Sequence, residues 1–311
     1  MESLNRTAVE LVDEALEFAE QLGVGAHELD NGATVLDFGV EFPGGLDAGL
    51  LLAEIQTAGL AGVTTRLEEL AGTPRTVVEV STDQPAIACL CSQKAGLELA
   101  VDGFEGLGSG PARALIGEED VFRQVGYHDA FDMATLAVET ETLPDEAVAD
   151  RVADLAEVSP ESVFLIAYPT ASVAGSVSAA ARTVELATYR LAELGYAPAD
   201  VLGGVGTAPL PPVAPAESTA MARGSDAVAY GGSVHLQVAE PVEDADAVVS
   251  TASEEYGDPL VDVFEAAGWD HAEVSRSVHA PARATVDVVG GDTHVVGSLH
   301  EDVLARSFGL E

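Results

Sequence analysis

Lysine is nearly absent from this sequence of 311 residues: Lys94 stands alone beside twelve arginines, against 53 aspartates and glutamates. The formal net charge is −40 at pH 7. Binding to nucleic acids and to anionic membranes depends on basic side chains that neutralise phosphates, so this composition excludes both kinds of partner. An acidic protein of an ordinary habitat would keep many lysines. The replacement of lysines by carboxylates therefore indicates adaptation to molar salt, which screens charge repulsion within about 3 Å.

Cysteine is also scarce, since the chain has only Cys89 and Cys91. Their number and spacing exclude a disulfide framework and a tetrahedral zinc site, and we expect a cytoplasmic protein. The seven histidines show no H-x-x-x-H or H-E-x-x-H spacing, so we expect no metal. Cys91 could act as a nucleophile, but no partner for it stands out. Burial as a small apolar side chain is the favoured alternative.

Long hydrophobic runs are missing apart from one uncharged stretch, residues 162–181. This stretch contains Pro169, Thr170 and four serines, which makes it a poor segment for a bilayer. We expect it to form a buried strand, a turn and the start of a helix. The first residues are acidic and amphipathic, and they do not resemble a signal peptide.

Hydrophobic residues make up 47% of the chain, enough for a sizeable core. Strand patterns alternate with helix patterns, and Asn31-Gly32 is a strong hairpin signal, which favours an α/β or α+β fold with mixed β-sheets. We expect two domains, over residues 1–116 and 117–311, which could be interleaved. The periodicity predicts helices over 4–22, 86–99, 144–158, 177–194 and 260–267. It predicts strands over 27–29, 33–38, 60–65, 76–81, 133–138, 163–168, 228–238 and 284–299. Residues 103–111 and 201–215 are rich in glycine and are predicted as loops.

The segment Ser92-Gln93-Lys94-Ala95-Gly96 holds the one lysine among small residues. A functional lysine that contacts an anionic group or polarises an oxygen explains why it is kept. A structural ion pair is the alternative.

Two further segments could bind a ligand. The backbone amides of Gly108–Arg113, together with Ser109 and the Arg113 side chain, could hold a phosphate or a carboxylate. On composition alone, a tight turn with Arg113 in a salt bridge is favoured. The G-x-G in this segment is too weak a match for a dinucleotide site, and no Walker A motif is present.

The other segment runs from Pro169 to Val177 and leads into Arg182 and Glu185. Its small residues would let a ligand approach. Arg182 and Glu185 are three apart and would share a helix face, where a carboxylate beside a guanidinium could activate water. Taken alone, such a pair is more often a surface pair of little energetic weight.

These segments, in this order, resemble the methenyltetrahydromethanopterin cyclohydrolase family of archaeal one-carbon metabolism, nearly from end to end. The matching segments are Asn31-Gly32 with Asp37 and Gly39, Asp47-Ala48-Gly49, Gly59-Leu60-Ala61, Ser92–Gly96, Gly108–Leu115, Leu143-Pro144, Pro169–Glu185, Tyr256-Gly257 with Pro259, Ala280-Pro281-Ala282 and Ser307-Phe308-Gly309-Leu310. The chain departs from the family pattern at Cys91, where Gly is usual, and at Leu97, where Trp is usual. The loss of that Trp leaves the contacts to the pterin open.

The resemblance implies a two-domain subunit in a homotrimer, with the pterin in a cleft between the domains. It implies hydrolysis of a cyclic methenyl-tetrahydropterin cation to the formyl-tetrahydropterin, with no metal or other cofactor. The carrier is methanopterin or folate. A non-catalytic or differently specific pterin-binding protein of the same fold is the alternative, although such a protein needs no base.

The resemblance places the catalytic pair on Arg182 and Glu185, with Glu185 as the base for water. We expect the substrate to be bound by residues of the three segments, namely Ser92, Gln93, Lys94, Ser109, Arg113, Thr170, Ser172 and Ser176.

Overall fold

A computed structural model of the chain describes residues 2–270 and 273–310. The chain forms two compact units, and each is made from two separate segments. The first unit comprises residues 1–62 and 87–178, and the second comprises residues 63–86 and 179–311. The boundary expected between residues 116 and 117 falls inside the first unit.

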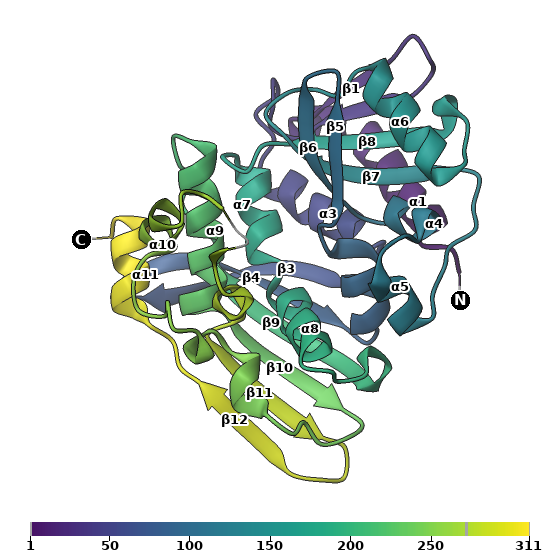
Figure 1. The fold of residues 1–311 in the computed structure, drawn as a ribbon. Coiled ribbons are helices and arrows are strands. Elements are labelled where there is room, and N and C mark those ends of the chain that lie inside the picture. Colours follow the sequence, from purple (N-terminus) through teal and green to yellow (C-terminus); the bar gives the residue numbers. More distant parts are fainter. Residues whose placement is uncertain (1, 271–272, 311) are drawn as a thin grey trace. The chain divides into compact units, whose positions relative to one another are not determined.

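The first unit contains a mixed sheet with the strand order β1-β2-β8-β7-β6-β5 (Figure 1). In chain order its strands are β1 (Gly25–Glu28), β2 (Thr34–Asp37), β5 (Leu97–Val101), β6 (Phe104–Ser109), β7 (Ala134–Glu139) and β8 (Val163–Tyr168). The central strands β2, β8 and β7 are parallel, and the outer strands join antiparallel. The carboxyl ends of β2, β7 and β8 therefore meet at one edge of the sheet.

Helices bury both faces of this sheet. Along β7, Leu136 and Val138 pack in the core cluster that includes α6, while Ala137 packs in the cluster that includes α1 and α3. Successive side chains of a strand point to opposite faces, so a strand covered on both sides needs an unbroken apolar run. The helices of this unit are α1 (Leu4–Glu17), α2 (Ala19–Leu22), α3 (Leu46–Gln56), the π-helix η1 (Ala86–Gln93), α4 (Ala112–Ile116), α5 (Asp120–Val125), α6 (Glu146–Ala156), η2 (Pro160–Ser162) and α7 (Val173–Ala180). The first residue of η1 and the last residues of α7 belong to the second unit.

The second unit contains a mixed sheet with the strand order β12-β11-β10-β9-β4-β3. In chain order its strands are β3 (Gly62–Leu70), β4 (Thr73–Thr82), β9 (Val201–Pro209), β10 (Ser233–Val238), β11 (Arg283–Val288) and β12 (Thr293–Gly297). Strands β10 and β11 are parallel, whereas β9 pairs antiparallel with both β10 and β4, and β12 pairs antiparallel with β11. Alternate residues of β10 are buried, as expected for a sheet with one covered face.

Helices α8 (Thr183–Glu193) and α9 (Glu217–Gly231) lie on that covered face (Figure 1). The C-terminal helices α10 (Leu260–Ala266) and α11 (Glu301–Phe308) pack on α9. Short 3-10 turns complete the unit at η3 (Pro198–Asp200), η4 (Ala245–Val248), η5 (Ser250–Ala252) and η7 (Arg276–His279).

A buried carboxylate ties three of these helices together. Asp226 of α9 accepts a hydrogen bond from the backbone N–H of Leu260 at 2.9 Å, at the start of α10, and one from Ser307 Oγ at 2.6 Å, in α11. Burial, the largest influence, raises the pKa of Asp226 to about 7 against the lowering effect of these hydrogen bonds.

Most of the predicted elements are confirmed. The Asn31-Gly32 hairpin joins β1 and β2, with Gly32 at φ +87°, and the strand predicted over 163–168 coincides with β8. The uncharged stretch 162–181 forms β8, a turn and α7. The mixed α/β class is also confirmed.

Two predicted loops are wrong. Residues 103–111 contain strand β6, and residues 201–215 contain strand β9. Each is paired on both sides, β6 by β5 and β7 and β9 by β10 and β4. Glycine weakens a strand by local propensity, and here the pairing outweighs that local signal.

Three predicted boundaries also differ. The helix over 86–99 is a π-helix that ends at Gln93, after which the chain enters the sheet at Leu97. The helix over 177–194 is broken into α7 and α8 at Ala181 and Arg182. The first residues of the strand predicted over 228–238 belong to α9, because a short apolar run does not distinguish a buried helix from a strand.

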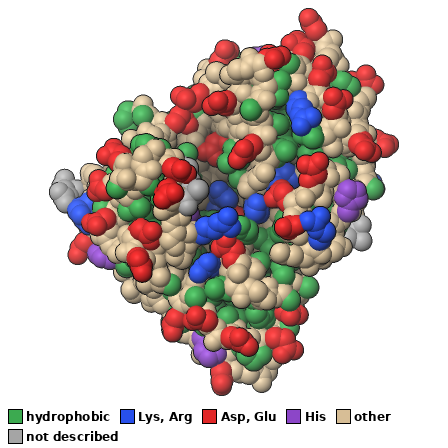
Figure 2. Space-filling view, in the orientation of Figure 1, with side chains coloured by type: hydrophobic (Ala, Val, Ile, Leu, Met, Phe, Trp, Pro, Cys, Tyr) green, Lys and Arg blue, Asp and Glu red, His purple; other side chains and the backbone are tan. Residues whose placement is uncertain are grey.

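Acidic side chains are spread over the face of the molecule shown in Figure 2. This agrees with the carboxylate-rich surface expected from the composition. Among the helices of residues 2–270 and 273–310, none is both long and apolar enough to span a bilayer.

Candidate active site

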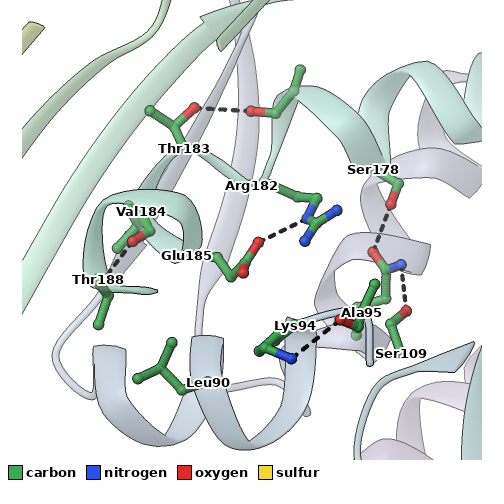
Figure 3. Close-up of polar contacts among 12 residues, drawn as sticks. Leu90, Lys94, Ala95, Ser109, Ser178, Arg182, Thr183, Val184, Glu185 and Thr188 are labelled. Carbon is green, nitrogen blue, oxygen red and sulfur yellow. Dashed lines mark hydrogen bonds and ion pairs between the residues drawn. The ribbon is translucent and has the colours of Figure 1, made fainter. Parts of the chain in front are cut away.

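Arg182 and Glu185 form an ion pair at the start of α8 in the second unit. Arg182 Nε donates to Glu185 Oε2 at 2.7 Å, and the two side chains point toward each other (Figure 3). Arg182 is the N-cap residue of α8, and Glu185 is the third residue of the helix. The predicted sharing of a face is therefore observed, although the helix begins at this pair rather than running through it.

Two glycines of β9 set the position of this helical turn. A Cβ atom on Gly204 would lie 2.7 Å from Val184 Cγ1, and one on Gly206 would lie 2.9 Å from Val184 Cγ2. Both distances are too short for a side chain on β9. The glycines therefore let the first turn of α8 lie directly on the sheet, which fixes where Glu185 is held.

The environment of Glu185 favours a fixed carboxylate. Its side chain is 1% exposed, whereas Arg182 is 29% exposed. A buried charge is tolerated only when it is paired, and Arg182 supplies the opposite charge. The carboxylate also lies in the first turn of α8, where the helix dipole favours negative charge. Such a carboxylate can accept a proton from a bound water, and the neighbouring guanidinium can orient it.

Lys94 and Arg113 meet in the first unit on one carboxylate, that of Glu119. Lys94 Nζ donates to Glu119 Oε2 at 2.8 Å and to the Ala95 carbonyl at 3.4 Å (Figure 3 shows the second bond). Arg113 Nε donates to Glu119 Oε1 at 2.8 Å. The structural ion pair that the sequence analysis named as the alternative role of Lys94 is thus present. A substrate contact of Lys94 stays a prediction.

The alternative that composition favours for Arg113, a salt bridge, is present in the structure. Its side chain is 1% exposed, and the guanidinium also lies over the Phe122 ring. Nη1 donates to the Ser92 carbonyl at 2.9 Å, Nη2 donates to the Leu90 carbonyl at 3.4 Å, and Nη2 lies 2.6 Å from Glu119 Oε1. These donors are directed into the protein, so Arg113 supports the backbone around residues 90–92. A substrate contact of Arg113 stays a prediction.

Ser92 and Ser109 share a buried network around Gln56. Ser92 Oγ donates to the Gln56 carbonyl at 2.6 Å, and the Gln56 side-chain amide donates to Ser109 Oγ and to Tyr168 Oη, both at 3.1 Å. Ser178 Oγ donates to Gln56 Oε1 at 2.9 Å, and Figure 3 shows the hydrogen bonds of Ser178 and Ser109 to this side-chain amide. A satisfied network of this kind rigidifies its surroundings, so it holds the ends of α3, η1 and β6 together.

The segment from Thr170 to Ser176 follows the carboxyl end of β8. Thr170 Oγ1 donates to Glu139 at the end of β7, and Ser172 Oγ donates to the Pro169 carbonyl at 2.7 Å and accepts from the Gly175 N–H at 2.9 Å. Ser176 is buried in α7. Ligands of α/β sheets bind outside the carboxyl ends of the strands, where these residues lie. Gln93 is buried at the end of η1.

Cys89 and Cys91 are buried and unbridged. Burial raises the pKa of the Cys91 thiol to about 12, which opposes a nucleophilic role and agrees with the apolar alternative. Within residues 2–270 and 273–310, no group of three His, Cys, Asp or Glu side chains could hold a metal ion. His271, one of the seven histidines, lies outside the described residues.

Sequence reasoning missed Glu119, Gln56 and Tyr168. Glu119 lies in the acidic run 118–120, and nothing in that run marks one carboxylate as the partner of distant residues. Gln56 and Tyr168 end a helix and a strand that show only apolar periodicity.

Comparison with known proteins gives consistent matches. The profile of the family described as cyclohydrolase (MCH) matches residues 3–308. The chain is 59% identical over 310 residues to the methenyltetrahydromethanopterin cyclohydrolase of Halobacterium salinarum, covering 100% of both chains. It is 38% identical over 314 residues to the protein of the same name from Methanocorpusculum labreanum, again covering 100% of both chains. It is 37% identical over 313 residues to that of Methanospirillum hungatei, covering 99% of both.

Proposed function

Because the chain belongs to the cyclohydrolase (MCH) family, we propose that it hydrolyses the methenyl-tetrahydromethanopterin cation to the formyl-tetrahydropterin. The Arg182–Glu185 ion pair carries this proposal. In this pair a buried carboxylate accepts a hydrogen bond from a guanidinium, which supports the assignment of the catalytic roles to Glu185 and Arg182.

The chemistry requires a base and no nucleophilic side chain. The amidinium carbon of the substrate is already electrophilic, so water adds to it directly and loses a proton to Glu185. One C–N bond of the ring then breaks, its nitrogen takes a proton, and the formyl group stays on the other nitrogen. The carboxylate of Glu185 also favours a cationic substrate over its neutral product. We propose that no metal or other cofactor takes part.

Loss of the methenyl chromophore tests this function. Purified protein in molar KCl should consume the methenyl form of tetrahydromethanopterin at a rate proportional to enzyme concentration. The folate analogue, assayed in parallel, identifies the carrier, for which the names of the relatives favour methanopterin. Tight binding of the pterin without turnover would establish the alternative, a non-catalytic pterin-binding protein.

Lys94→Ala should lower kcat/KM at least tenfold, equivalent to about 1.4 kcal/mol. We propose that the Lys94 ammonium, 17% exposed beside Glu119, contacts an oxygen of the pterin or of its anionic extension. Lys94→Arg should restore only part of the loss, because a guanidinium differs from an ammonium in shape and hydration. Steady-state kinetics and thermal melting of the same variants decide the matter. A lower Tm with unchanged kcat/KM would show that Lys94 has a structural role, in its ion pair with Glu119, and no role in substrate binding.

We also propose a homotrimer in the cytoplasm of a salt-loving archaeon. The net charge of −40 predicts that folding and assembly need high ionic strength, since screening relieves repulsion between carboxylates. Tm should rise, and the sedimentation coefficient should reach that of a trimer, as KCl increases from dilute buffer to molar concentration. A trimer of equal stability across that salt series would contradict the prediction.

A further inference from the structure

The backbone before Lys94 has an unusual conformation. Residues Ala86–Gln93 form the π-helix η1, and the Lys94 N–H continues its pattern by donating to the carbonyl of Cys89, five residues earlier, at 2.7 Å. π-helical turns are rare in proteins overall, and those that do occur are often found at functional sites. The carbonyls of Leu90 and Ser92 near the end of η1 accept hydrogen bonds from the Arg113 guanidinium, and Ser92 also accepts from the Gly110 N–H at 2.8 Å.

The charge of Arg113 in this buried position requires an anion, and Glu119 supplies it. Glu119 is 26% exposed. Burial alone would raise the pKa of Glu119, but the charge of Arg113 and the hydrogen bond from Lys94 outweigh it, so the pKa falls below its usual range. The carboxylate therefore stays ionised at neutral pH.

The two oxygens of Glu119 are divided between two cations. Oε1 accepts from Arg113 Nε, and Oε2 accepts from Lys94 Nζ at 2.8 Å. Gly96 leaves the space for this arrangement, because a Cβ atom there would lie 2.5 Å from Glu119 Oε2. Each part of the segment 92–96 thus contributes: Ser92 its carbonyl, Lys94 its ammonium, and Gly96 the absence of a side chain.

We infer that Glu119 is a positioning residue for Lys94. It connects the Lys94 ammonium to the fixed guanidinium of the buried Arg113 and so narrows the set of rotamers that the lysine side chain samples. Glu119 balances the charge of Arg113 through Oε1, and its contact with Lys94 is made separately through Oε2. This inference rests on the proposed function and deepens it, since it assigns the residue that orients the substrate-binding lysine.

A double-mutant cycle tests the inference. Glu119→Gln should lower kcat/KM about tenfold, mainly through KM, because an unfixed ammonium binds the substrate less well. In a Lys94→Ala background the same change should alter kcat/KM less than about twofold, since no ammonium remains to be positioned. Gly96→Ala, which crowds the carboxylate, should show the same dependence on Lys94. Glu118→Gln, at the exposed neighbouring residue, is the matched control and should have wild-type kinetics.

A second measurement does not depend on turnover. Because Lys94 is the only lysine in the sequence, an amine-specific acylating reagent followed by peptide mass spectrometry reports on this one side chain. The rate of acylation at Lys94 should rise at least fivefold in Glu119→Gln and stay unchanged in Glu118→Gln.

The outcomes separate the inference from the function beneath it. A wild-type protein that turns over neither methenyl-pterin defeats the proposed function and the positioning role with it. The wild-type protein could turn over the substrate normally while Glu119→Gln lowers kcat/KM equally in both backgrounds, or leaves the acylation rate unchanged. Either result defeats the positioning role alone.

Discussion

Glu185→Gln should lower kcat by about 10²–10⁴-fold while leaving substrate binding largely intact. Gln is nearly the same size and still accepts a hydrogen bond from Arg182 Nε, but it cannot take a proton from water. The substitution therefore removes the proposed base and keeps the geometry, which is fixed by the contact of α8 with Gly204 and Gly206. Single-turnover measurements of chromophore loss in molar KCl give the rate of the chemical step, and titration of the variant with substrate gives Kd.

The control is Glu243→Gln, an exposed glutamate of the same unit that undergoes the same change in charge. It should retain wild-type kcat. Turnover of Glu185→Gln near that of the wild type would show that another group takes the proton. Circular dichroism of each variant separates loss of chemistry from loss of folded protein.

Asp226→Asn should stabilise the protein at neutral pH and above, and much less at pH 5. The folded-state pKa of Asp226, about 7, lies above its ordinary value of 3.8, so the unfolded chain ionises first as the pH rises. The stability that the wild type has at low pH is therefore lost progressively between about pH 4 and 7. Asn is uncharged at every pH and can still accept the hydrogen bond from the Leu260 N–H. The difference in unfolding free energy between variant and wild type should grow by about 3 kcal/mol from pH 5 to pH 8.

Urea unfolding of both proteins at pH 5 and pH 8, in the same molar KCl, measures this difference. Asp292→Asn, in the exposed turn between β11 and β12, is the matched control and should follow the wild type at both values. A pH-independent gap between Asp226→Asn and the wild type would mean that the carboxylate is ionised in the folded protein throughout this range.

The sequence predicts most elements whose signal is local. The hairpin at Asn31-Gly32 needs positive φ, which glycine supplies, and β8 is an unbroken apolar run because helices cover both faces of its sheet. The strands β6 and β9 could not be predicted in this way. Their glycines indicate loops locally, and in β9 those glycines are required by α8, a partner that no local window contains.

The same distinction applies to the candidate site. Arg182 and Glu185 are three residues apart, so local spacing was enough to predict that they meet. Arg113, Glu119 and Lys94 meet because the fold brings α4, the residue before α5 and the end of η1 within reach of one another's side chains. Composition does not reveal that a predicted ligand-binding arginine is buried. The retention of Lys94 in a chain that otherwise lacks lysine is visible in the sequence. The carboxylate that holds it could be found only in three dimensions.

The division of each unit into two chain segments has a consequence for synthesis on the ribosome. Strand β4 ends at Thr82, and its partner β9 begins at Val201, about 120 residues later. At usual elongation rates the β3–β4 hairpin emerges roughly 6–24 s before the strand that completes its sheet. During that interval β4 presents an unpaired edge, which is a template for pairing with other chains. The last segment of the first unit ends at residue 178, so this unit can finish folding before β9 has been synthesised. The nascent chain then carries one complete unit and one exposed strand edge at the same time.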